Sequence, residues 1–136
     1  MNVMSARAMG QYKQVETRVG ADSADPHQLI IMLFDGVLER IAVAKGAIYR
    51  NDIEEKGQKI GRAIAILDGL RGALNSELGG DISDNLDRLY DYMQRRLFDA
   101  NLNSDVLALD EVADLIKEIK SAWAAIPFDM RQSEHA

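Results

Sequence analysis

The two histidines, His27 and His135, are the residues of this chain best suited to acid–base or metal chemistry. A di-iron centre in a helical bundle needs a glutamate from each of two helices and a Glu-x-x-His pair from each of the other two. Neither histidine follows a glutamate by three positions. Neither stands in the middle of a helical pattern, where a phosphotransfer bundle would present its histidine. We therefore expect no di-iron site and no phosphotransfer role, and we expect His27 on the surface at a helix start.

Nucleophilic catalysis is equally poorly supported. The chain has no cysteine, and none of its serines stands in a G-x-S-x-G context, so most of them are typical of caps and turns. Gly79-Gly80-Asp81 lacks the G-K-[ST] ending of a phosphate-binding loop and is typical of a turn between helices. The sequence predicts no catalytic residues, no metal site and no cofactor, and hence no enzyme.

Composition and charge exclude further classes of protein. The 136 residues carry a net charge of −6, whereas nucleic-acid binding requires a basic surface. No apolar run approaches the length of a membrane span, and the stretch 1–12 lacks the apolar core of a secretory signal. These features indicate a single-domain cytoplasmic protein without disulfides.

Helical periodicity dominates the chain, and no stretch alternates with period two. Asp25-Pro26 is a strong helix start, and the apolar stripe that follows it continues to Ile48. A second stripe spans 53–78 and ends at Gly79-Gly80, and a third starts at Asp81 and reaches Ala100. After a turn at 101–104, with Ser104 as the expected cap, a fourth stripe reaches Ile126 before Pro127.

Four helices joined by turns this short are expected to be antiparallel neighbours. We therefore predict an all-α, antiparallel up-down-up-down four-helix bundle over residues 25–127. Residues 1–24 form an N-terminal capping segment in this interpretation, and residues 128–136 form a flexible tail.

Surplus apolar side chains are the informative feature of these helices. They fall beside the expected core stripes, at positions where a bundle that only folds would carry lysine or glutamate. Contiguous apolar surface marks partner sites, and we favour grooves that accept an amphipathic helix. A homodimer that buries the same faces is the alternative. The candidate partner contacts are Leu29, Met32, Val43, Ile66, Leu70, Phe98 and Leu102.

Six glycines inside the predicted helices have two interpretations that the sequence leaves open. They either allow close packing between helices or create shallow grooves for a partner helix. The affected positions are Gly36, Gly46, Gly57, Gly61, Gly69 and Gly72.

Three segments identify a family. "AMGQYKQVET", "SADPHQLIIMLFDGVLERIAVAKGAI" and "GGDISDNLDRLYDYMQRRLFDANLNSD" occur in this order. Together they resemble the flagellin-specific export chaperones, the FliS family, from about residue 8 to residue 125. Phe34 stands where the family commonly has tyrosine, which removes one hydroxyl.

The resemblance implies a cytoplasmic chaperone that binds the C-terminal helices of flagellin one to one and prevents their premature polymerisation. It also implies delivery to the flagellar type III export gate, with other flagellar assembly factors as candidate competitors. Met9 and Tyr12 match the family segment that contacts the export gate. We expect residues 1–24 to cover a groove until flagellin binds, with an ordinary frayed terminus as the alternative.

Arg95 and Arg96 have two interpretations as well. They either form rim contacts with acidic positions of the client or pair within the bundle with Asp91 and Asp99, and we favour the pairing within the bundle. A self-associating helical-bundle adaptor that uses the same apolar faces remains the alternative function.

Overall fold

The computed structural model describes residues 25–77 and 80–127, and side chains are described throughout these ranges except at 74–77. Every element in this part of the chain is a helix. The helices are α2 (Pro26–Tyr49), α3 (Ile53–Glu77), α4 (Gly80–Asn103) and α5 (Val106–Ala124). The predicted segments 1–24 and 128–136 lie outside the described residues.

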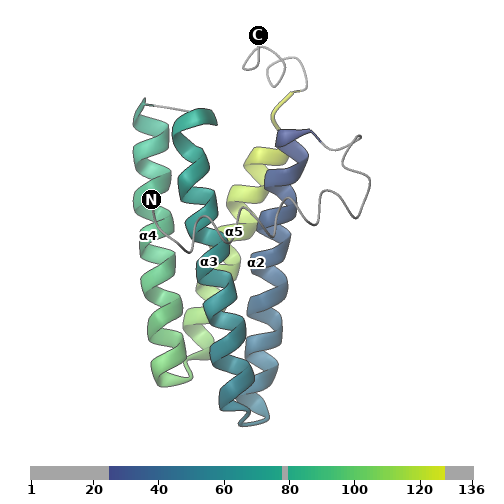
Figure 1. Ribbon diagram of the computed structural model, residues 1–136, viewed down its shortest axis with the longest axis vertical. Coiled ribbons are helices and arrows are strands. Elements are labelled where there is room, and N and C mark those ends of the chain that lie inside the picture. Colours follow the sequence, from purple (N-terminus) through teal and green to yellow (C-terminus); the bar gives the residue numbers. More distant parts are fainter. Residues whose placement is uncertain (1–24, 78–79, 128–136) are drawn as a thin grey trace.

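The four helices form an antiparallel up-down-up-down bundle (Figure 1). Neighbours in the sequence pack against each other, and α5 closes the bundle by packing on α2. The start of α2, the end of α3, the start of α4 and the end of α5 therefore lie at one end of the bundle, at the top in Figure 1. We call this the open end. The predicted fold class is confirmed.

Side-chain caps set the helix starts. A carboxylate oxygen of Asp25 accepts the Gln28 backbone N–H at 2.7 Å, and Asp52 accepts that of Glu55 at 3.0 Å. The cap of α5 is Asp105, which accepts the Ala108 N–H at 3.2 Å, so the expected cap at Ser104 is wrong. Ser104 instead has a φ of +49° in a tight turn, because α4 continues to Asn103 instead of ending near residue 101.

Gly80 carries the left-handed conformation that the sequence predicts between the second and third helices. Its φ is +63°, a value that glycine adopts without the steric cost a side chain would add.

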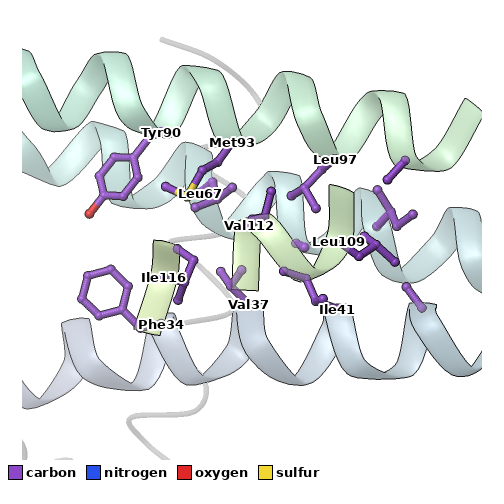
Figure 2. Packing of buried hydrophobic residues seen from close by; sticks show 14 of the residues in the cluster. Phe34, Val37, Ile41, Leu67, Tyr90, Met93, Leu97, Leu109, Val112 and Ile116 are labelled. Carbon is purple, nitrogen blue, oxygen red and sulfur yellow. The ribbon is translucent and has the colours of Figure 1, made fainter. Parts of the chain in front are cut away.

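The middle of the bundle is filled by one continuous apolar core. Val37 and Ile41 from α2 meet Leu97 from α4 and Val112 from α5, and all four are buried (Figure 2). Leu67 adds the contribution of α3. The three- and four-residue spacing of these positions is the stripe pattern that predicted the helices.

Two predicted stripe positions lie outside this core. Ile53 is 74% exposed and Ile82 is 62% exposed, each in the first turn of its helix. The stripe pattern holds along each helix but fails at these two positions, because the described helices leave the first turns of α3 and α4 largely uncovered.

Gly36 on α2 faces α3. A Cβ atom added at Gly36 would lie 3.2 Å from Cδ1 of Ile66, so the two helices approach closely at this level. Of the two interpretations of the helical glycines, close packing describes Gly36. Gly61 and Gly72 differ, because an added Cβ would meet no atom within 4 Å there.

Arg71 ties α3 to α4 through a polar network. Its guanidinium donates to both carboxylate oxygens of Asp87, at 2.8 and 3.1 Å, and to Oε1 of Gln94 at 2.9 Å. The Arg71 hydrogen bonds lower the pKa of Asp87 below its ordinary value. A carboxylate with a lowered pKa adds stability above its unfolded-state pKa, near 4, and loses it as the pH falls through the folded value.

We therefore expect Arg71→Gln to raise the pKa of Asp87 towards its ordinary value. The wild-type chain should lose slightly more stability on acidification than the variant, by less than about 1 kcal/mol because both side chains are partly exposed to solvent. NMR titration of the Asp87 carboxyl carbon measures the shift. An unchanged Asp87 pKa in Arg71→Gln would contradict the assignment. Lys117→Gln, which removes one positive charge at an exposed position of α5, is the matched control.

Candidate partner-binding groove

An apolar groove occupies the open end of the bundle. Its volume is about 360 Å³, and all four helices contribute to its walls. The lining residues are Ile30, Phe34, Leu70, Ala73, Ile82, Leu86, Tyr90, Ile119, Ala122, Trp123 and Ile126. We call this cavity the end groove.

The end groove arises where the core stripes reach the ends of the helices. Phe34 and Tyr90 form its floor and are buried, and Figure 2 shows them together at one end of the packed core. Beyond them the stripes continue with Ile82 on α4 and Ile126 after α5, and the residues that the structure describes add no further layer of side chains over them. Ala122 leaves room where a larger residue would fill the space.

The rim of the groove is held by a reciprocal pair between the first turn of α2 and the last turn of α5. Nε2–H of His27 donates to the Trp123 carbonyl at 2.6 Å, and Nε1–H of Trp123 donates to the His27 carbonyl at 3.0 Å. The two rings stack with centroids 5.1 Å apart. The expected surface position of His27 is therefore wrong, since this side chain is buried against Trp123. The pair fixes one wall of the groove.

The groove carries no charged side chain among its lining residues. Burial raises the pKa of the Tyr90 hydroxyl above its ordinary value, so that this group stays neutral. Such a surface suits the apolar face of a helix, because burying both faces removes apolar area from water without stranding a charge.

The seven partner-contact candidates from the sequence fall into three places. Leu29 is 6% and Leu70 is 2% exposed, so the expectation that they lie outside the core is wrong. Leu29 is one of the buried residues of α2, and Leu70 belongs to the core cluster. Leu70 keeps one relation to the site, because it also lines the end groove.

Met32, Val43 and Ile66 are half-buried along the line where α2 meets α3. They do not reach the end groove.

Phe98 and Leu102 are 58% and 67% exposed, one turn apart on the outer side of α4. Phe98 borders a shallow hollow of mixed character, together with Ile64 and the polar side chains of Gln94 and Arg95. Phe98 and Leu102 lie near the end of α4, at the end of the bundle opposite the end groove. Met9 and Tyr12 lie outside the described residues.

The interpretation that Arg95 and Arg96 pair within the bundle is confirmed. Nε of Arg95 lies 3.1 Å from Asp91, one turn earlier on α4. Arg96 lies 3.9 Å from Asp99, but its shorter ion pair, at 2.7 Å, joins it to Glu111 on α5.

Glu111 also accepts a second hydrogen bond from α4. The Tyr92 hydroxyl donates to the Glu111 carboxylate at 2.7 Å. Hydrogen bonds from Arg96 and Tyr92 lower the pKa of Glu111.

The sequence predicts most groove residues as core and therefore misses the site. Periodicity assigns Ile30, Leu86 and Ile119 to the same stripes as the fully buried positions, and it has no information on where a bundle ends. One signal was present, namely large apolar residues in terminal turns, such as Ile82 after Gly79-Gly80 and Trp123 before Pro127.

Metal chemistry and membrane insertion find no support in the described ranges. No cluster of histidine and carboxylate side chains there suits a metal ion. None of the four helices combines the length and the apolar character that a membrane span requires.

The fold and the groove define a four-helix bundle with an apolar surface suited to another helix. Comparison with known proteins identifies the family within this class to which the chain belongs. Residues 7–129 match the family model described as flagellar protein FliS. The flagellar secretion chaperone FliSB of Pseudomonas aeruginosa is 52% identical over 120 residues, which cover 88% of this chain and 95% of that protein.

The flagellar secretion chaperone FliS of Salmonella typhimurium is 43% identical over 123 residues, which cover 90% of this chain and 91% of the relative. That of Vibrio cholerae is 42% identical over 116 residues, or 85% of each chain. The chain belongs to the FliS family of flagellar secretion chaperones. The relatives are named as chaperones and not as enzymes.

Proposed function

We propose that this protein binds the C-terminal helical region of flagellin in the cytoplasm and delivers it to the flagellar type III export gate. The end groove carries the proposal. It is an apolar surface that the packed bundle leaves uncovered, and the chain belongs to a family of chaperones. The apolar stripes of flagellin's terminal helices would dock there, which would keep them from pairing with each other before export.

Binding of this kind needs no nucleotide or metal. A segment that folds as it binds loses conformational entropy, which offsets part of the free energy gained from apolar burial. The complex can therefore bury a large area and still release its client. This balance suits a chaperone that must hand flagellin to the export gate.

Mixing the full chain with a C-terminal flagellin fragment tests the proposal. We expect a 1:1 complex, measured as a mass by light scattering after size-exclusion chromatography. A self-associating adaptor would instead remain a homodimer whose mass the fragment does not change. That outcome would replace the chaperone proposal with the alternative.

The N-terminal segment is a separate part of the proposal and depends on the sequence alone. Met9 and Tyr12 would contact the export gate, and residues 1–24 would cover a groove in the free protein. Hydrogen exchange across residues 3–19 should then differ between the free and the flagellin-bound chain. Equal exchange in both states would remove the covering role.

A further inference from the structure

The chain leaves α5 at the wall of the end groove. The Ile126 N–H donates to the Trp123 carbonyl at 3.2 Å, and Nε2–H of His27 donates to the same carbonyl at 2.6 Å. These hydrogen bonds hold the end of α5 against the first turn of α2, and the Ile126 side chain lines the groove. The point from which residues 128–136 continue is therefore fixed at the groove.

Pro127 ends the helical path at this point. Its ring prevents a further helical turn, and it favours an extended backbone at the preceding residue, Ile126. Consecutive Cα atoms lie about 3.8 Å apart, so the Cα atom of Phe128 stays within about 8 Å of that of Ile126. Connectivity alone therefore keeps a large apolar side chain next to the groove.

The segment after Pro127 begins with an alternation of apolar and charged residues, Phe128-Asp129-Met130-Arg131. Side chains alternate between the two sides of an extended backbone, so that Phe128 and Met130 would share one side. That side matches the groove, whose lining residues include no charged side chain. The opposite side would keep both charges in water, where they need no partner.

The groove presents the apolar surface that such a segment would cover. Ile82 on α4 is 62% exposed, Ala122 on α5 is exposed, and the volume of the groove is about 360 Å³. A segment tethered this closely binds at an effective concentration in the millimolar range. Two apolar side chains of low intrinsic affinity are therefore enough to cover the groove for most of the time.

The N-terminal segment is tethered less closely. It also joins the bundle at the open end, where Asp25 caps α2. Its last large apolar residue is Val19, and the stretch between Val19 and α2, Gly-Ala-Asp-Ser-Ala-Asp, contains only small or acidic residues. A longer flexible connection lowers the effective concentration, whereas Phe128 follows Pro127 directly. The segment after α5 is therefore the favoured occupant of this groove.

We infer that Phe128 and Met130 occupy the end groove of the free protein and that a client helix must displace them to bind there. The occupancy concerns this chain alone, whereas the displacement rests on the proposed function. A segment that covers the groove in about nine molecules of ten would weaken client binding about tenfold. It would also shield the apolar lining from non-specific contacts until the client arrives.

The test changes the two anchors in the full chain. Trp123 is the only tryptophan of the sequence and lines the groove, so its fluorescence reports on what covers it. Phe128→Ser with Met130→Ser should increase acrylamide quenching of Trp123 about twofold and shift its emission to longer wavelength, because the covered population is lost. The matched control, Tyr49→Ser with Leu107→Ser, removes an aromatic and an aliphatic side chain from exposed positions at the opposite end of the bundle. It should leave the quenching unchanged.

Client binding provides a second measurement. Phe128→Ser with Met130→Ser should bind the C-terminal flagellin fragment about three- to tenfold more tightly than wild type in calorimetry, because no segment has to be displaced. Phe128→Leu keeps an apolar anchor at this position. It should retain most of the wild-type quenching and affinity.

Two further measurements address the other occupants. Quenching that increases in Val15→Ser with Val19→Ser, but not in the Phe128 and Met130 variant, would assign the groove to residues 1–24 and overturn the inference. Quenching of the wild-type chain that increases on dilution would assign the groove to a second copy, which would also overturn it.

The possible results separate this inference from the proposed function. Equal quenching in wild type and in the Phe128 and Met130 variant would show an open groove and overturn the inference, while the proposed function stands. Greater quenching with unchanged affinity for the fragment would overturn the displacement by the client. A fragment that binds neither chain would overturn the proposed function, and the quenching would still decide the occupancy.

Discussion

Glutamate at both Ile82 and Ala122 is expected to weaken binding of the C-terminal flagellin fragment about 100-fold or more while the bundle stays folded. Both positions line the end groove, from α4 and from α5, and both are exposed in the free protein. Their substitution therefore leaves the core intact. A docked helix would cover the two carboxylates, and an unpaired carboxylate loses hydration when it is buried. A 100-fold loss corresponds to about 2.7 kcal/mol, within the range that such burial costs.

The local backbone is expected to tolerate these changes. Ile82 lies in the first turn of α4, where the helix dipole favours a negative charge. Ala122 lies in the last turn of α5, where a negative charge is mildly unfavourable by a few tenths of a kcal/mol. Circular dichroism and thermal unfolding of the free variant would check that the bundle is retained.

A matched variant distinguishes the end groove from the outer face of α4. Phe98→Glu with Leu102→Glu makes the same change in net charge at two exposed positions outside the groove. The sequence alone favours this face as a flagellin contact, whereas the end groove is the surface whose lining residues include no charged side chain. Loss of binding in both variants would show that flagellin extends over both surfaces. Loss in the Phe98 and Leu102 variant alone would remove the end groove from the site.

The fold followed from the sequence because its main signal repeats along the whole chain. Stripes such as Val37, Ile41 and Ala44 must face a common interior, and the short turns leave antiparallel neighbours as the simplest arrangement. Helix starts were also predictable where a local cap decides them, as at Asp25. Ser104 failed as a cap because α4 continues to Asn103, and Asp105 was in position to cap α5 instead.

The binding surface could be predicted less well from the sequence. The exposure of a side chain depends on the neighbouring helices, and the apolar pattern of a single helix contains no information on them. Leu29 and Leu70 fall beside the main stripes of their helices but are covered by adjacent helices. Ile82 falls on its stripe but is exposed, because the bundle ends there. His27 illustrates the same limit, since its partner Trp123 is 96 residues away in the sequence.

The adjacent residues Leu97 and Phe98 provide the sharpest contrast between core and surface on one helix. Leu97 is completely buried in the middle of the bundle (Figure 2). Phe98, the next residue, is 58% exposed. We expect Leu97→Ala to lower the free energy of unfolding by about 3 kcal/mol. The lost apolar burial and the cavity left between the helices both contribute to this loss.

Phe98→Ala removes a larger side chain from the neighbouring position but should change stability by less than about 1 kcal/mol, because most of that side chain already contacts water. Urea unfolding of both variants measures the difference, with equal slopes as evidence that the same surface is exposed on unfolding. Equal losses in the two variants would mean that Phe98 packs in a way its exposure does not indicate. A stable Phe98→Ala variant with weakened flagellin binding would assign this ring to partner recognition, because its contribution to folding would already be known to be small.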